Sequence, residues 1–326
     1  MDRNFVKSLA LAALAASALA TAASAGTNET GSLLVFPQYD NHRAVQTLLT
    51  VTNTNTDLDT GTVKVEFVYI NGWNCQEFNR TRTLTPGDTL SVLSKVDNPN
   101  CVEGYMYAFA KHKTTGAAIK FDYLAGAALI LNEGATDPDT LYTPYTFKAA
   151  AGLAEGANTD VDGDGLRDLN GNEYEKGPDQ LIIPNFLAED DTWESQLILI
   201  NLSGGSQFTA TVNFLVYNDN EEVFSAQTSF TCWKNCQLSH ISNVFDDSFL
   251  VTTNQNPNEI QGGGPLPETG WFTVDGLVAN STAASIANPM ILGMLIIHDD
   301  DEGGSALPYT RGQQDNGALL GHSIFP

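Results

Sequence analysis

The residues best suited to chemistry are acidic and lie close together near the middle of the chain. The segment Asp160-Val161-Asp162-Gly163-Asp164-Gly165-Leu166-Arg167-Asp168 has carboxylates at positions one, three, five and nine of a loop, with glycine at position six. Ca²⁺ takes roughly six to eight oxygen ligands, and a glycine allows the sharp turn that such a loop needs. We therefore expect a structural calcium site formed by Asp160, Asp162, Asp164 and Asp168, with the main-chain carbonyl of Leu166 as a further ligand.

This segment resembles the calcium loops of EF-hands, dockerins and thrombospondin type 3 repeats, and the resemblance covers this segment alone. It departs from the EF-hand at position twelve, where Gly171 replaces the bidentate glutamate. Glu173 or Glu175 could supply the missing carboxylate. The alternative interpretation is an acidic, glycine-rich linker that stays solvated, although carboxylates packed this closely repel one another without a cation.

Motifs typical of catalysis are absent from the sequence. It has no Gly-x-Ser-x-Gly elbow, no His-Glu-x-x-His, no phosphate loop and no dinucleotide fingerprint. We therefore expect no enzymatic activity. A glycoside hydrolase is the weaker alternative, because 39 acidic residues offer many carboxylate pairs and only geometry would select one.

Four cysteines indicate disulfides in a chain that also carries an export signal. Of the three ways to pair them, we favour Cys75 with Cys101 and Cys232 with Cys236. The spacing of Cys232 and Cys236 is one residue longer than Cys-x-x-Cys, and no second pair completes a zinc site.

Export is predicted from the first 25 residues. Arg3 and Lys7 precede an alanine-rich apolar stretch from Leu9 to Ala20, and the small residues Ala23-Ser24-Ala25 follow as a cleavage site. We expect a signal peptide over 1–25, no membrane span, and a location that is extracellular, at the cell surface or periplasmic. The net charge of −24 disfavours nucleic acid as a partner, because a polyanion needs a basic surface.

An internal repeat is visible when the chain is aligned with itself at a shift of about 147 residues. Val65-Glu66-Phe67-Val68-Tyr69 falls on Val212-Asn213-Phe214-Leu215-Val216, and Leu49-Thr50-Val51-Thr52-Asn53 falls on Leu197-Ile198-Leu199-Ile200-Asn201. Further along, the shift grows to 166 or 167, where Gly104-Tyr105 meets Gly270-Trp271. The second copy therefore contains an insertion at about 251–268.

Alternation of apolar and polar residues predicts strands at corresponding places in both copies, for example over 62–69, 105–110 and 210–216. A short helix is expected only over 146–155. We predict an all-β fold of two tandem antiparallel β-sandwich domains, Ig-like or jelly-roll-like, that arose by duplication. They should span 26–148 and 180–326, joined by an acidic linker over 149–179 that carries the calcium-type loop.

These features favour a secreted, noncatalytic structural or interaction protein, a surface, adhesion or assembly module with a calcium-stiffened joint. Self-association, or a glycan or protein partner at a surface, fits this interpretation. The alternative is an extracellular glycan- or ligand-binding module that uses the inserted loop and a stacking face made from Trp73, Trp193, Trp233 and Trp271.

Overall fold

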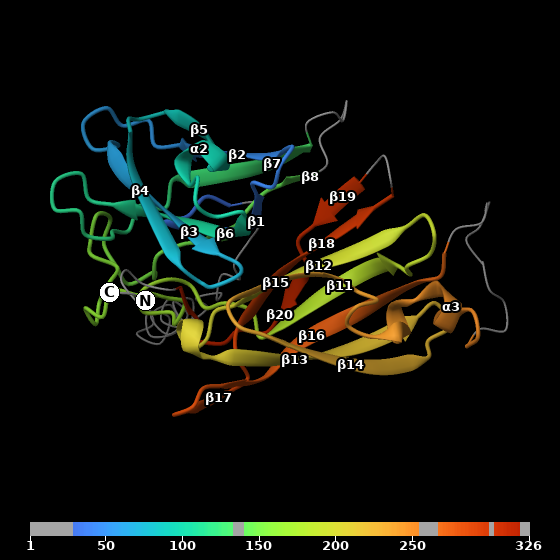
Figure 1. Ribbon diagram of the computed structural model, residues 1–326. Coiled ribbons are helices and arrows are strands. Elements are labelled where there is room, and N and C mark those ends of the chain that lie inside the picture. Colours follow the sequence, from blue (N-terminus) through green and yellow to red (C-terminus); the bar gives the residue numbers. More distant parts are fainter. Residues whose placement is uncertain (1–28, 133–139, 254–266, 300–302, 320–326) are drawn as a thin grey trace, which may run out of the picture.

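The computed structural model describes residues 29–132, 140–253, 267–299 and 303–319. Within these ranges the chain is nearly all β, and every pair of neighbouring strands is antiparallel (Figure 1). In the described part of the chain the α-helices are short: α2 (Ser94–Asp97) and α3 (Asp247–Leu250). None of the described helices has the length and apolar character needed to cross a membrane. The helix expected over 146–155 is wrong, because residues 145–147 pair as an edge strand instead.

The first half of the chain forms a broad and a narrow sheet. The first broad sheet has the order β4 (Glu77–Leu84), β3 (Val63–Asn71), β6 (Glu103–Lys111), β1 (Leu33–Asp40), β9 (Tyr145–Phe147). The first narrow sheet has the order β5 (Thr89–Leu93), β2 (Val45–Asn53), β7 (Leu124–Asn132), β8 (Thr140–Tyr142). Strands predicted from alternation at 62–69 and 105–110 are confirmed as β3 and β6.

The second half also forms a broad and a narrow sheet. The second broad sheet has the order β14 (Val223–Phe230), β13 (Thr209–Asn218), β16 (Thr269–Asn280), β11 (Gln180–Leu187), β20 (Tyr309–Arg311), and β17 (Ser285–Ala287) pairs with β16. The second narrow sheet has the order β15 (Trp233–Gln237), β12 (Glu194–Asn201), β18 (Ile291–His298), β19 (Gly303–Ala306).

Strand order and irregularities correspond between the halves. In both broad sheets the first strand along the chain pairs with a later long strand through a shifted register, between Phe36 and Tyr39 in β1 and between Ile183 and Phe186 in β11. Gly104 and Gly270 occupy the same register position, and a Cβ on either would collide with a carbonyl oxygen of the neighbouring strand. Each half therefore has a glycine at the position where the neighbouring strand's backbone leaves no room for a Cβ.

One apolar core lies inside the second half and a larger one continues across both halves. Leu197, Leu199 and Phe214 belong to the core between the second broad and second narrow sheets. On the opposite face of β12, Ile198 and Ile200 join the core that contains the first broad sheet. The second narrow sheet is consequently apolar on both faces, and its outer face covers the first broad sheet (Figure 1).

A disulfide links the two halves at this contact. Cys75, in the turn between β3 and β4, is bonded to Cys232, and the Trp233 indole next to it donates a 2.8 Å hydrogen bond to the Pro37 carbonyl. The predicted pairs of Cys75 with Cys101 and of Cys232 with Cys236 are wrong, and Cys101 and Cys236 are free thiols. Residues four apart along an extended strand are about 13 Å apart, too far for the Cα separation of a disulfide.

Candidate metal centre

The acidic loop does not stand apart from the sheets. It follows β9, and its two-residue strand β10 (Arg167–Asp168) pairs with β21 (Ala318–Leu319) near the end of the described chain. An isolated bridge joins Ile119 to Asn158 on one side, and the fully buried Leu169 and Tyr174 pack into the larger core on the other. The loop is thus held on the first broad sheet by a segment from the second half.

Backbone amides fix the carboxylates of the loop. Asp160 Oδ1 accepts a 2.9 Å hydrogen bond from the Gly163 amide, and Asp164 Oδ1 accepts one of 2.7 Å from Leu166. Gly163 and Gly165 have φ angles of 79° and 85°, a region that side chains with a Cβ rarely adopt. The alternation of aspartate and glycine therefore has a structural reason, since each turn needs both residue types.

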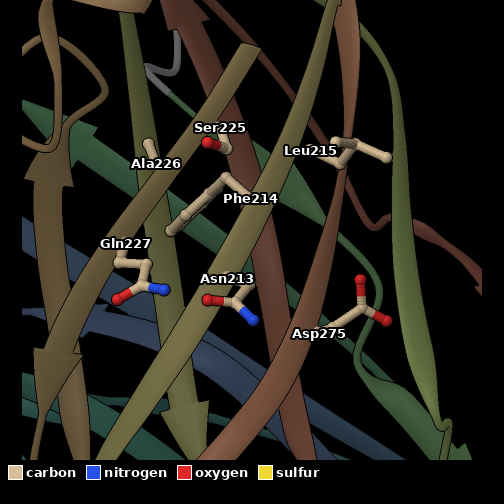
Figure 2. A pocket seen from close by; sticks show the side chains of 7 residues that line it. All are labelled: Asn213, Phe214, Leu215, Ser225, Ala226, Gln227 and Asp275. Atoms are coloured by element: carbon tan, nitrogen blue, oxygen red, sulfur yellow. The ribbon is translucent and has the colours of Figure 1, made fainter. Parts of the chain in front are cut away.

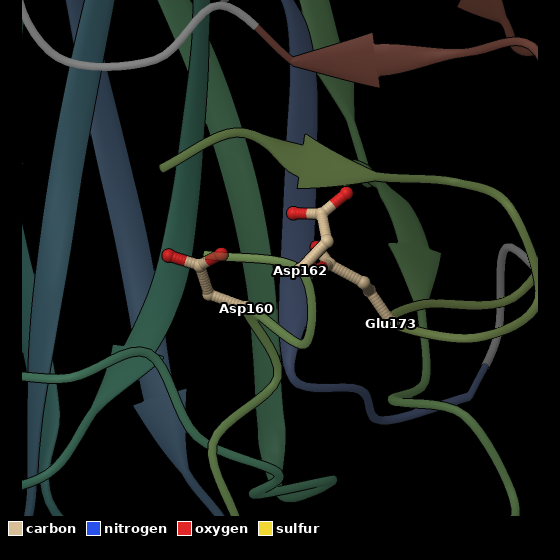
Figure 3. Close-up of side chains that lie close together, drawn as sticks. All are labelled: Asp160, Asp162 and Glu173. Carbon is tan, nitrogen blue, oxygen red and sulfur yellow. The ribbon is translucent and has the colours of Figure 1, made fainter. Parts of the chain in front are cut away.

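Two overlapping groups of carboxylates come together here. Asp160, Asp162 and Glu173 form one group (Figure 3), and Asp162, Asp164 and Asp168 form the other. The possible ligand atoms inside each group lie within 4.8 Å of one another. Asp162 belongs to both groups, and its side chain is exposed. Oxygen donors in this number suit a hard divalent cation.

Glu173 is the deepest carboxylate of the site. It is 1% exposed, and its two oxygens accept hydrogen bonds of 2.6 Å from the Val161 amide and 3.2 Å from the Asp168 amide. Its neighbour Glu175 instead accepts a hydrogen bond from the Lys148 amide. Of the two glutamates named as substitutes for position twelve, the structure places Glu173 at the loop and Glu175 outside the carboxylate groups.

Burial changes the acidity of two members. Burial raises the pKa of Glu173, and it raises the pKa of Asp168 together with the charges of Asp164 and Asp162. Both carboxyls hold their protons more tightly than in the unfolded chain, because no positive charge fully offsets the loss of water. A cation in the loop would favour their ionised form.

Arg167 lies at the candidate site, and its position there was not predicted from the sequence. Its Nη2 lies 3.6 Å from Asp160 Oδ2 and donates a 2.6 Å hydrogen bond to the Gly165 carbonyl, while its guanidinium lies 5.0 Å from the centre of the Phe109 ring. The only signal for it was a cationic residue inside an acidic run. A cation bound by Asp160 must share that carboxylate with the guanidinium.

The other predicted features are the Leu166 carbonyl ligand, the tryptophan stacking face and the inserted loop. Leu166 donates its amide to Asp164, and its carbonyl as a ligand stays a prediction. The stacking face of four tryptophans is wrong, because Trp233 is buried between the halves and Trp73 is 93% exposed at a turn. The inserted loop falls largely on 254–266, outside the described residues.

Comparisons with known proteins identify no family. No family model matches the chain, and no curated protein matches it. Among solved structures, Thermotoga maritima 1070 aligns with 14% identity over 39% of this chain and 98% of its own, at a TM-score of 0.28. The cowpea mosaic virus top component aligns with 11% identity over 94% of this chain and 99% of its own, at a TM-score of 0.17.

A third structure, the tandem CBM22-1-CBM22-2 domain of Paenibacillus barcinonensis Xyn10C, aligns with 10% identity over 86% of this chain and 85% of its own, at a TM-score of 0.18. Similarities at these TM-scores carry no conclusion about the fold or the function of this chain.

Proposed function

We propose that the chain is a secreted, noncatalytic structural protein made of two β-sandwich domains that arose by duplication. The matched strand orders, the matched register shifts and the equivalent glycines Gly104 and Gly270 support the duplication. The domains span 26–148 and 180–326, and 149–179 forms the joint. The proposed signal peptide, 1–25, lies outside the described residues.

The proposed joint contains a calcium site. The observation that carries this proposal is Glu173, a buried carboxylate brought against Asp160 and Asp162 from a second segment of the loop. Calcium would cross-link these segments and thereby hold β10 against β21, the pairing that ties the joint to the second domain. Its role is structural, because the cation would fix how the domains meet.

Calcium titration calorimetry of the chain from residue 26 tests this proposal. Asp162→Asn should weaken calcium binding at least about tenfold, because Asp162 belongs to both carboxylate groups and the amide retains the turn while losing the charge. Asp190→Asn is the matched control: Asp190 likewise accepts backbone hydrogen bonds in an exposed turn, but it lies outside the groups. Equal affinities in all three proteins, or no binding in any, would reject the site.

The assembly part of the proposal has a separate test. Size-exclusion chromatography with light scattering should show self-association of the chain from residue 26 that increases with calcium and decreases with a chelator. Asp162→Asn should behave as the chelated protein does. A protein that stays monomeric at every concentration, with and without calcium, would contradict a role in assembly.

A further inference from the structure

The contact between the two halves provides a pattern for a contact between two molecules. The outer face of the first broad sheet carries Leu33, Val35, Glu66, Val68, Ile70, Tyr105, Tyr107, Phe109, Tyr145 and Phe147. The outer face of the second narrow sheet covers one end of this outer face of the first broad sheet. The Tyr145 hydroxyl donates a 2.8 Å hydrogen bond to the Gly293 carbonyl, and Trp233 packs against Gly72 at the end of β3.

The second broad sheet has an outer face whose positions correspond one to one. By register these are Gln180, Ile182, Asn213, Leu215, Tyr217, Trp271, Thr273, Asp275, Tyr309 and Arg311. The end that matches the covered end of the first broad sheet is apolar and aromatic. Trp271 and Tyr217 stack there with ring centres 4.2 Å apart and planes 3° apart.

Among the described residues this second face is partly exposed, although Thr273 at its centre is buried. Leu215 is 39% exposed and Tyr309 is 69% exposed, whereas their counterparts Val68 and Tyr145 are 1% exposed. The opposite end of the face is polar, and Figure 2 shows Asn213, Gln227 and Asp275 there. The polar end corresponds to the part of the first broad sheet where Arg167 of the acidic loop lies over Phe109.

The first narrow sheet offers the complementary face, and in the described part of the chain the second half contacts it only at its β8 edge, where the Ser305 hydroxyl donates a hydrogen bond to the Leu141 carbonyl. Its outer face is formed by Leu48, Thr50, Thr52, Ser91, Ala125, Ala127 and Leu129, which correspond to the second narrow sheet's Gln196, Ile198, Ile200, Asn235, Leu292, Met294 and Ile296. Thr50 bonds to Ser91 and Thr52 to Thr89 across the strands, so the hydroxyls are paired within the face. Small side chains here leave room for the larger rings of the second broad sheet.

We propose that the second broad sheet of one molecule packs on the first narrow sheet of the next, in the arrangement that the halves use within the chain. The contact joins unlike faces, so each molecule keeps one free face of each kind, and repetition gives a filament or a closed ring. This inference rests on the proposed structural function and names the surface through which it acts.

Two single variants and their mixture test the contact by light scattering and sedimentation. Leu215→Glu places a charge on the outer face of the second broad sheet, and Ala125→Glu places one on the outer face of the first narrow sheet, away from the second half. Each variant alone should be monomeric where the unmodified protein associates. An equal mixture should form dimers and nothing larger, because each variant supplies the face that the other lacks. Trp73→Glu, at an exposed turn outside both faces, should associate normally.

The outcomes separate this inference from the proposed function. Assembly that neither variant changes would overturn the face-to-face contact and leave a structural protein that uses another surface. Loss in Leu215→Glu alone would indicate a contact between like faces and also overturn the inference. The unmodified protein could instead be retained on an immobilised polysaccharide. If Leu215→Glu abolishes that retention while assembly stays normal, the outer face of the second broad sheet binds a glycan and the inference is overturned. A protein that never associates would overturn both proposals. Circular dichroism and thermal unfolding establish that each variant is folded.

Discussion

Glu173 and Asp168 connect the acidic loop to pH. Burial raises the pKa of Glu173 from its usual 4.5, and burial with neighbouring charges raises that of Asp168 from 3.8. A carboxyl whose pKa is raised by folding binds more protons in the native state than in the unfolded state. Without a cation, the stability it contributes is therefore present below its unfolded pKa and is lost as the pH rises through the folded pKa.

Calcium should reverse this dependence, since it requires both carboxyls to be ionised. We predict that calcium binds more weakly at about pH 5 than at about pH 7, and that binding releases protons. Calorimetry at both pH values, in buffers of different ionisation enthalpy, measures the affinity and the number of protons released. An affinity that is unchanged between these pH values, with no proton release, would show that Glu173 and Asp168 are not ligands.

At the residue scale, the sequence predicted the loop better than its environment. The Asp-x-Asp-x-Asp-Gly spacing identified the turns correctly, because each aspartate caps amides close to it in the chain. Glu173 was named as one of two glutamates that could replace the carboxylate missing at position twelve, and the structure places it at the loop. Arg167 over Phe109 could not be predicted, because that contact depends on how the loop lies on a distant sheet.

At the element scale, the disulfide joins two turns rather than closing one hairpin. Cys75 and Cys232 are 157 residues apart in sequence. In the chain-entropy view, closing a loop of this length restricts the unfolded state by about 5 kcal/mol, an upper figure because denatured chains retain structure.

We therefore predict that Cys75→Ala with Cys232→Ala lowers the free energy of unfolding by about 2 to 5 kcal/mol. Chemical denaturation of the oxidised protein and of the double variant measures this difference. Cys236→Ala removes a thiol that lies outside the bond and should change stability little. Equal stabilities of the double variant and the unmodified protein would mean that packing alone holds the halves together.

The positions of strands could be predicted from the sequence, but the packing of a sheet of one half on a sheet of the other could not. Alternation identified β3, β6 and β13, since a half-buried strand shows its period directly. Ile198 and Ile200 read as ordinary core residues beside Leu197 and Leu199. They face a different core from their neighbours, and period two cannot distinguish one core from another.

At the scale of the whole molecule, the halves depend on each other. The outer face of the first broad sheet includes Val68, Tyr105 and Tyr107, all nearly or fully buried, and the second half supplies part of their cover. A fragment of residues 26–179 should expose this apolar surface, bind a hydrophobic dye and aggregate.

Dye fluorescence and light scattering of that fragment, compared with the chain from residue 26, measure the effect. Adding the separately produced fragment 180–326 should suppress both signals, because its narrow sheet carries the matching face. A soluble 26–179 monomer that binds no dye would contradict this dependence and favour two independent domains.

The bond between Cys75 and Cys232 also orders events during biogenesis. If the chain is exported from its N-terminus as proposed, Cys75 and Cys101 reach an oxidising compartment while Cys232 is still in transit. The first two thiols to meet are therefore not the native pair. The native disulfide must either form after the second half docks or be reached by thiol exchange. In both cases it forms only once the second half of the chain is present.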